Sequence, residues 1–394
     1  MKRIHAPLLM PAFCLITGIA AGNILPNWTV GLAVLVVCVL ITALLSRWPR
    51  WQTTGIWICV LILGMTLGAR SEGRKTRNEV QTTGIEQRFL GWRSTLLEHY
   101  RQWGISDEAY GVMAAMTLGD KSAIDKETRS TYRKVGAAHI LALSGLHLMI
   151  IYGVISLLIG WRRIRMLSQI LIILSIWAFA LLTGLSPSIV RSASMITVYA
   201  LLSLGNREKM SVNTLAFVAI IMLVINPMAI YDIGFQLSFM AVLAIVLINP
   251  LLYGIIPLHI QVRHRWLSAL WGVATVSISA QIGTAPLVAY YFGYFSTWFL
   301  LTNYIVVPLA TLVLYLTPVL LVVSWWPWGV AFMAKVLSAI VLLMNHLLKW
   351  ITTLPYCSID GITLSTLQVF LLYIIIGSIY ITVSLRYPTV RRNG

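Results

Sequence analysis

Long apolar runs, separated by short polar or Pro- and Gly-containing turns, recur along the whole chain. A helix that crosses a bilayer needs ~20 predominantly apolar residues, and turn residues of this kind mark the ends of such helices. The runs lie near residues 7–25, 28–46, 55–69, 138–160, 167–185, 187–205, 212–226, 232–252, 266–291, 297–323, 329–350 and 364–385. The pattern predicts an all-α, polytopic helical membrane protein with about twelve transmembrane helices.

Composition supports lipid as the solvent. Of 394 residues, 59% are hydrophobic and 10% are charged, whereas soluble domains carry about 25% charged residues. The first apolar run is not followed by a small-residue cleavage site and a soluble domain but by further apolar runs, so we expect it to remain as a helix. The four cysteines have no short paired spacing, which argues against disulfide and metal sites. We expect no metal and no cofactor.

The positions of Lys and Arg predict the orientation of the chain. Cytoplasmic loops collect positive charge, and twelve alternating spans with a cytoplasmic N-terminus put nearly every basic cluster on that side. These clusters are Lys2 and Arg3; Arg47 and Arg50; Arg162, Arg163 and Arg165; Arg207 and Lys209; Arg263 and Arg265; and Arg386, Arg391 and Arg392. Both termini are therefore expected in the cytoplasm. Because this rule accounts for most of the +17 net charge, charge alone is weak evidence for nucleic-acid binding.

Residues 70–137 differ from the rest, with twelve Lys/Arg and nine Asp/Glu. Trp92, Leu96 and Tyr100 recur every four residues, which predicts an amphipathic helix lying on the membrane surface. A second helix is expected to start after Ser106, and a third to end at Gly136. The expected organisation is residues 1–69, N-terminal transmembrane helices 1–3; 70–137, an external loop with amphipathic helices; 138–385, a transmembrane bundle; and 386–394, a cytoplasmic tail. A solvated connector without a ligand is the alternative for the loop.

Polar side chains inside the apolar runs are the candidate site residues. A charge at mid-helix costs ~2.5–3.5 kcal/mol on insertion scales, so such groups usually face an interior. They are His139, Ser144, His147, Arg191, Asp232, Gln236, Gln281 and Asn303. In the predicted topology these residues come from five helices and fall in the outer half of the bilayer. This placement predicts a polar chamber that opens toward the outside.

Structural roles are the alternative for the same residues. Arg191 and Asp232 would form an ion pair between helices, and the amides would hydrogen-bond between helices for ~0.6 kcal/mol each. Ser144, Gly145 and residues 184–187 are either packing contacts or helix breaks. Helix breaks recur where transporters bind their substrates.

Four stretches of this sequence resemble the ComEC family of DNA-internalisation competence proteins. They are Leu118-Gly-Asp-Lys121 with residues 138–147; residues 182–191; Asn226-Pro227 with residues 232–239; and residues 279–308. Their order and spacing are similar to those of the family's membrane competence domain over roughly residues 106–350. The resemblance implies that single-stranded DNA passes through the bundle into the cytoplasm during natural transformation. It also implies a multi-pass channel component of the bacterial inner membrane, with the eight polar residues as channel-lining or scaffold positions.

The sequence departs from many members of that family in two ways. An external OB-like module often follows the third helix, but the roughly twenty residues after Arg70 cannot form a five-stranded barrel. A metallo-β-lactamase-like domain often follows the last helix, and no histidine-rich metal motif occurs among the seven histidines. Capture and degradation of strands would then fall to other proteins. A shortened or degenerate copy is the alternative.

The external loop supplies candidates for DNA contact. Single strands are held by basic grooves and by aromatic stacking worth ~1–3 kcal/mol per base. The candidates are Arg74, Lys75, Arg77, Arg88, Trp92, Arg93, Tyr100, Arg101 and Trp103. No Gly-x-x-x-x-Gly-Lys-Ser/Thr loop is present, so force is expected from a cytoplasmic ATPase or strand-capturing proteins acting in trans. Other expected partners are single-stranded DNA, the lipid bilayer and a DNA receptor, and a homo-oligomer stays open.

Two other classes of function remain as alternatives. A secondary transporter or flippase for a small or lipidic substrate would use Asp232 and the histidines as a proton relay. An intramembrane hydrolase would combine Ser144 or His147 with Asp232. We expect no catalytic residues and no enzyme activity.

Overall fold

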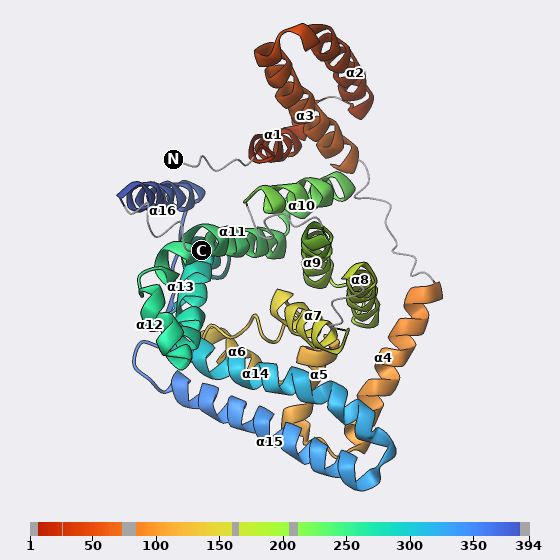
Figure 1. The fold of residues 1–394 in the computed structure, drawn as a ribbon, viewed down its shortest axis with the longest axis vertical. Helices are drawn as coiled ribbons and strands as arrows, with labels where there is room; N and C mark the ends of the chain where they lie inside the picture. The colour runs from red at the N-terminus through yellow and green to blue at the C-terminus, as the bar shows by residue number, and fades with distance from the viewer. Residues whose placement is uncertain (1–6, 26, 73–83, 160–164, 205–211, 387–394) are drawn as a thin grey trace. The chain divides into compact units, whose positions relative to one another are not determined.

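The chain is almost entirely helical. The computed structural model describes residues 7–25, 27–72, 84–159, 165–204 and 212–386. Its α-helices are α1 (Leu9–Ala20), α2 (Trp28–Leu44), α3 (Pro49–Glu72), α4 (Gly84–Gln102), α5 (Asp107–Leu118), α6 (Lys126–Lys134), α7 (Gly145–Ile159), α8 (Arg165–Leu182), α9 (Pro187–Leu204), α10 (Val212–Ile225), α11 (Ile233–Tyr253), α12 (Leu258–Arg263), α13 (Arg265–Phe292), α14 (Phe299–Val322), α15 (Pro327–Thr352) and α16 (Thr366–Arg386) (Figure 1).

Every predicted apolar run corresponds to a helix. Within the described residues, six helices are long and apolar enough to cross a membrane, and six shorter apolar helices of 10–17 residues account for the remaining runs. The third run, which the sequence places at residues 55–69, is the longer 24-residue helix α3. The all-α polytopic architecture is therefore confirmed.

The chain divides into two compact units. Unit 1 comprises Met1–Gln81 and Gly205–Phe239, and unit 2 comprises Thr82–Leu204 and Met240–Gly394. Unit 1 holds α1 to α3, α10 and the 3-10 helix η4 (Pro227–Tyr231). Unit 2 holds α4 to α9 and α12 to α16, and α11 is shared between the units.

Glycines bring α1 and α3 into close contact in unit 1. A Cβ at Gly18 would lie 2.2 Å from the Leu61 carbonyl oxygen, and one at Gly64 would lie 2.5 Å from the Leu15 carbonyl oxygen. Side chains cannot be accommodated at such distances, so the two backbones pack directly. Small residues at helix interfaces serve this purpose in membranes, where lipid competes for apolar surface.

Substitution of Gly64 tests this packing. We expect Gly64→Val to destabilise the protein by ~1–3 kcal/mol, because the added atoms meet backbone that cannot move independently. The measurement is the thermal unfolding midpoint of the detergent-purified protein. Gly377→Val in α16 is the matched control, since no heavy atom lies within 4 Å of its Cβ position. Equal shifts in the two variants would contradict the interpretation.

The main core of unit 2 is built around α5, α14 and α15. All residues of α5 from Ala109 to Leu118 are buried, and they pack against Val313, Leu337 and Val341 among others. Within the predicted external loop of residues 70–137, the helix expected to start after Ser106 is α5, and it is buried in the core of unit 2. Its first turn is acidic, but the rest is apolar on every side, which is typical of a buried helix.

Much of the apolar face of α4 packs against the protein core of unit 2. Tyr100 is 1% exposed and its hydroxyl lies 3.3 Å from that of Thr117 in α5. Leu96 and Trp103 pack against the same core, whereas Trp92 is 59% exposed. The four-residue spacing thus predicted the helix correctly, but part of its apolar stripe is buried inside unit 2.

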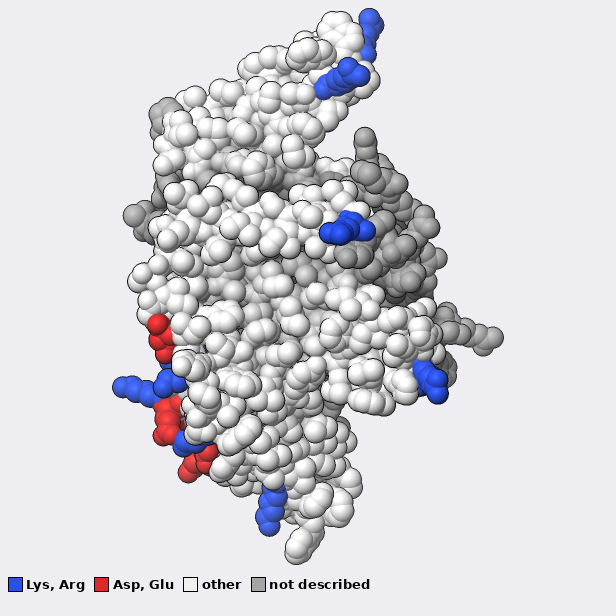
Figure 2. Space-filling model, turned by 90° about the vertical axis from the view of Figure 1, so that its left-hand side faces the viewer, with Lys and Arg blue, Asp and Glu red and all other residues white. Residues whose placement is uncertain are grey.

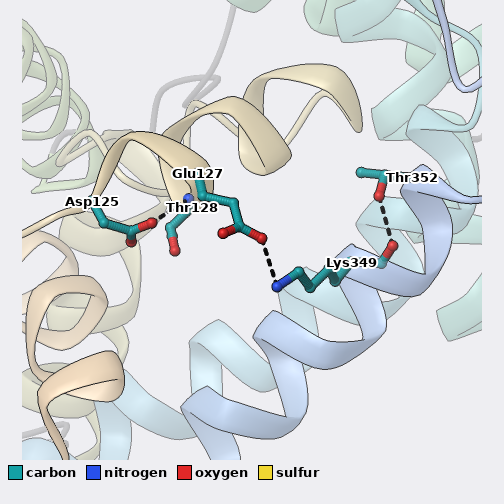
Figure 3. A network of polar contacts seen from close by, with 5 residues as sticks. All are labelled: Asp125, Glu127, Thr128, Lys349 and Thr352. Atoms are coloured by element: carbon teal, nitrogen blue, oxygen red, sulfur yellow. Dashed lines mark hydrogen bonds and ion pairs between the residues drawn. The ribbon is translucent and has the colours of Figure 1, made fainter.

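Helix α6 is attached to segments far away in the sequence. Glu127 forms an ion pair of 2.6 Å with Lys349 at the end of α15 (Figure 3), and the Tyr132 hydroxyl donates to the Asn345 side-chain oxygen at 2.8 Å. Arg133 donates to the Phe292 carbonyl at 3.0 Å.

Figure 2 shows a face of the molecule on which acidic residues are few and gather with basic ones along one edge.

A two-stranded sheet joins the loops beside α6. Strands β1 (Tyr294–Ser296) and β2 (Ser358–Asp360) pair antiparallel, with Tyr294 opposite Asp360 and Ser296 opposite Ser358. These strands follow α13 and α15, two helices that the predicted topology directs outward. The loop before α7 also contacts β1, since the Gly136 Cβ position lies 3.1 Å from Ser296. The segment after α6 and the loops after α13 and α15, all predicted to lie outside the membrane, are therefore neighbours in unit 2.

Asp125 caps α6 and makes its stability dependent on pH. Its carboxylate accepts the Thr128 backbone N–H at 2.9 Å, and hydrogen bonds from Thr128 lower its pKa. Because the folded pKa is depressed, the contribution is present above the ordinary pKa of ~3.9 and is lost as the pH falls through the folded value. Asp125→Ala should cost ~1 kcal/mol of local stability at pH 7.

Amide hydrogen exchange of residues 126–134 measures this effect. The difference between wild type and Asp125→Ala should disappear in acid, whereas Asp125→Asn should retain the cap at both pH values. A difference between wild type and Asp125→Ala that is unchanged at low pH would contradict the assignment.

Candidate functional site

Three helix-breaking segments meet in unit 2. A Cβ at Gly119, which follows α5, would lie 2.5 Å from Leu143 Cδ1 and 3.7 Å from the Thr183 carbonyl oxygen. Leu143 precedes α7, and Thr183 follows α8. Residues 118–121, 138–147 and 182–191 were singled out in the sequence, and the fold brings them together. We call the place where Gly119, Leu143 and Thr183 meet the junction.

The segment before α7 is irregular and buried. The predicted helix over 138–160 is wrong at its start, because α7 begins only at Gly145. Gly136 has φ +81° after α6, and the following Ala137, Ile140 and Leu143 are at most 4% exposed. Non-helical backbone at membrane depth is tolerated where protein buries it or where it lines a cavity.

Ser144 and His147 form the start of α7. The Ser144 backbone N–H donates to His147 Nδ1 at 3.2 Å, and the Ser144 hydroxyl lies 2.9 Å from the same nitrogen. Nδ1 is thus the acceptor, which places the proton of a neutral ring on Nε2. The arrangement resembles a capping box in which the third helical residue returns to the cap. His147 is 1% exposed, so the pair stabilises this helix start inside unit 2.

A second break separates α8 from α9. Gly184 and Leu185 both have positive φ, +79° and +48°, a conformation that costs a non-glycine residue energy. Pro187 then starts α9, where its fixed φ and missing N–H suit the first position. Of the two alternatives left open for Ser144, Gly145 and residues 184–187, the structure thus shows helix breaks. Arg191, in the second turn of α9, is 5% exposed.

An ion pair connects α4 to the junction. Arg93 Nη2 lies 3.8 Å from Asp120 Oδ1, and Arg93 Nη1 lies 3.5 Å from the Gly184 Cβ position. Burial opposes ionisation of Asp120, but hydrogen bonds from Ser122 and the charges of Arg93 and Arg101 outweigh it and lower the pKa. Asp120 is therefore a carboxylate at neutral pH.

The other candidates for the polar chamber lie on different elements and have different hydrogen-bond partners. His139 is exposed, and its Nδ1 lies 3.1 Å from the Gly136 carbonyl oxygen. In unit 1, Asp232 caps α11 by accepting the Phe235 N–H at 2.7 Å, and Gln236 donates to the Ile230 carbonyl at 2.9 Å. Both hydrogen bonds are to backbone groups at the start of α11 and therefore support the scaffold. Gln281 and Asn303 are half-buried on α13 and α14.

The single polar chamber stays a prediction. His147 and Arg191 belong to unit 2 and Asp232 to unit 1, so the proposed Arg191–Asp232 pair also stays a prediction. Two surface hollows in the described part of the chain are lined by residues other than the chamber candidates. One, of about 490 Å³, lies at residues 48–51, and the other, of about 250 Å³, lies between the starts of α5 and α6.

The DNA-contact candidates fall into different groups. Arg74, Lys75 and Arg77 lie outside the described residues. Tyr100 is wrong as a stacking residue in this structure, because its ring is buried and burial raises its pKa to about 12. Arg88 and Trp92 are exposed one turn apart on α4. Arg101 lies over the Tyr110 ring at 4.8 Å, and Trp103 stacks on His99 at 5.4 Å.

Sequence reasoning missed the role of Gly119 and Asp120. The signal was the Leu118-Gly-Asp-Lys121 motif itself, since Gly119 adopts φ +73° and ends α5 in the left-handed conformation, as glycine commonly does at a helix end. Among the described residues, no group of three or more His, Cys, Asp and Glu side chains is arranged to hold a metal ion.

Gly119→Val should disrupt the junction. Leu143 is 4% exposed, so it has little room to move away from the new side chain, and we expect an added ~1–3 kcal/mol of destabilisation. Gly104→Val is the control because Gly104 has φ +77° but no heavy atom within 4 Å of its Cβ position. The thermal unfolding midpoint should fall further for Gly119→Val. An equal fall in the control would contradict this, because the destabilisation would then come from the positive φ alone and not from contact with Leu143.

The helices and the buried breaks between them define an all-α polytopic membrane protein. A family model described as Competence protein matches residues 116–386. Because the match covers more than half of the chain, the protein belongs to this family, and the resemblance found in the sequence is confirmed.

Individual relatives support the assignment. The chain is 31% identical over 205 residues to ComE operon protein 3 of Bacillus subtilis, which is 52% of this chain and 25% of that protein. It is 27% identical over 173 residues to the competence protein ComA of Neisseria gonorrhoeae, which is 39% of this chain and 24% of that protein. An uncharacterized protein of Aquifex aeolicus is 28% identical over 199 residues, half of this chain and 44% of that protein. The chain thus spans less than half the length of each of these relatives. No solved structure matches.

Proposed function

We propose that this protein is a channel component that passes single-stranded DNA across the bacterial inner membrane during natural transformation. Membership of the Competence family supports a role in DNA uptake. The observation that carries the finer proposal is the junction, where three family-like motifs meet at two helix breaks inside unit 2. Substrate paths in membrane proteins are built from interrupted helices of this kind.

The junction offers weak attraction for phosphates. Helices α7 and α9 both begin beside it, and the N-terminal end of a helix carries a partial positive charge that favours anions. Arg191 adds a buried cation in the second turn of α9. A channel needs contacts strong enough for entry and weak enough for exit, and few charges suit that requirement.

Helix α4 supplies the approach to this path. Arg88 and Trp92 are exposed on one face, so a phosphate and a base of one nucleotide are within reach of neighbouring side chains. Base stacking on an aromatic ring contributes ~1–3 kcal/mol without regard to sequence. In this proposal both termini are cytoplasmic, and the chain conducts the strand without cutting it.

Other proteins complete the process. A receptor delivers the strand, and a cytoplasmic ATPase or a strand-capturing protein pulls it inward. The rival proton-relay transporter would require Asp232 to be protonated in each cycle. Since Asp232 caps α11, protonation would weaken the helix start each time, and we prefer conduction of DNA.

Gene deletion tests the proposal directly. In a transformable host, deletion should abolish entry of labelled DNA into the cytoplasm while binding at the cell surface remains. Unchanged cytoplasmic entry would exclude the import function.

Substitutions test the path. Arg191→Ala should lower uptake by roughly tenfold, equivalent to ~1.4 kcal/mol of lost interaction with the passing strand. Lys335→Ala, an exposed position on α15, is the control and should have little effect. Protein levels measured by immunoblot must be normal in both. Equal, negligible effects would show that Arg191 does not contribute to conduction.

A further inference from the structure

The ion pair between Arg93 and Asp120 is loose. Their closest atoms are 3.8 Å apart, beyond the 2.7–3.2 Å of a typical N–H···O hydrogen bond. Each side chain remains about one-fifth exposed. The attraction is therefore mainly between charges, and solvent or another anion can reach the guanidinium.

Asp120 and Arg93 differ in how far their hydrogen bonds are satisfied. Asp120 Oδ1 accepts the Ser122 backbone N–H at 3.0 Å, so its position is fixed by the loop itself. Arg93 makes no hydrogen bond from its guanidinium within the described part of the chain, although this group carries five N–H donors. The arginine is held close to the junction with its donors uncommitted.

The surroundings of the pair are positively charged. Arg101 acts on Asp120 together with Arg93, and Lys121 follows directly in the chain, where it experiences the charge of Arg129. Both of the charged side chains that act on Asp120 are arginines. An added anion would thus meet excess positive charge at a place bordered by Gly184, where Arg93 Nη1 lies 3.5 Å from the Cβ position.

We propose that Arg93 binds a phosphate of the single strand at the junction and that Asp120 is the competing anion, which holds the guanidinium in place until a phosphodiester displaces it. This inference rests on the proposed function and names a contact within it. Planar guanidinium groups bind phosphate through two parallel hydrogen bonds, a better arrangement than the 3.8 Å contact with Asp120. The exchange replaces one ion pair by another and breaks no covalent bond.

The proposal predicts opposite effects for the two partners. Arg93→Ala removes the phosphate contact and should weaken binding of oligonucleotide by roughly tenfold. Asp120→Asn removes the competitor, keeps an oxygen to accept the Ser122 N–H, and should tighten binding by roughly two- to fivefold. A pair that only stabilises the fold would make both variants weaker.

The experiment uses the full chain in nanodiscs and a fluorescein-labelled oligothymidylate, with affinity measured by anisotropy over a range of salt concentrations. Arg93→Ala should also reduce the salt slope by ~0.7, the value for one phosphate contact to a single strand. In an Arg93→Ala background, Asp120→Asn should give no gain. This double-variant cycle separates competition from a general change in charge.

The Glu127–Lys349 pair provides matched controls. Glu127→Gln and Lys349→Ala make the same changes in charge at an exposed ion pair between α6 and α15, and they should alter affinity less than twofold. A gain in Glu127→Gln equal to that in Asp120→Asn would overturn the inference. So would unchanged or weaker binding in Asp120→Asn, or a gain that persists without Arg93.

Failure of the proposed function gives a different result. If the wild-type chain binds no oligonucleotide at any salt concentration, both the function and the inference are overturned. If the wild type binds and the predicted opposite effects are absent, only the competition between Asp120 and phosphate is overturned.

Discussion

The structure depends on one constraint, that a backbone which leaves the helical conformation inside a membrane must be covered by protein. Helices satisfy their own backbone groups, but a break exposes them, and lipid offers no partner. Unit 2 meets this requirement by surrounding the irregular residues before α7 with the end of α5 and the turn between α8 and α9. Helix α5, apolar on every side, fills the core beside α14 and α15. The breaks can therefore hold Ser144 and Asp120 in fixed positions.

The sequence was informative wherever a signal was local. Apolar runs identified twelve helices, since length and hydropathy are properties of short segments. Ser144-Gly145 and Gly184 through Pro187 were either packing contacts or helix breaks, and residue types of this kind do favour caps and turns. The hydrogen bond between Ser144 and His147, three residues apart, is also local, but the helix was expected to begin earlier. Apolar residues 137–143 suit a helix equally well, and only tertiary packing decides their conformation.

The pairing of distant segments could not be predicted from the sequence. Arg93 was a DNA-contact candidate, but its partner Asp120 and its neighbour Gly184 come from elements without a recognisable pairing signal. Tyr100 shows the opposite problem, because its spacing with Trp92 on one stripe gave no indication that one ring is buried and the other exposed. The glycine contacts between α1 and α3 could not be predicted either. A glycine in an apolar run gives the same sequence pattern whether or not another helix packs against it.

The attachment of α5 and α6 to α15 has a consequence for biosynthesis. Tyr132 and Asn345 are 213 residues apart, so the segment from α4 to α6 leaves the ribosome long before its packing partners. Until α14 and α15 have entered the membrane, the ten consecutive core residues of α5 have no native surface to cover them. Contacts of such long range form late and leave apolar surface open to wrong associations meanwhile. The apolar surface of α5 is therefore covered only after α14 and α15 have been synthesised.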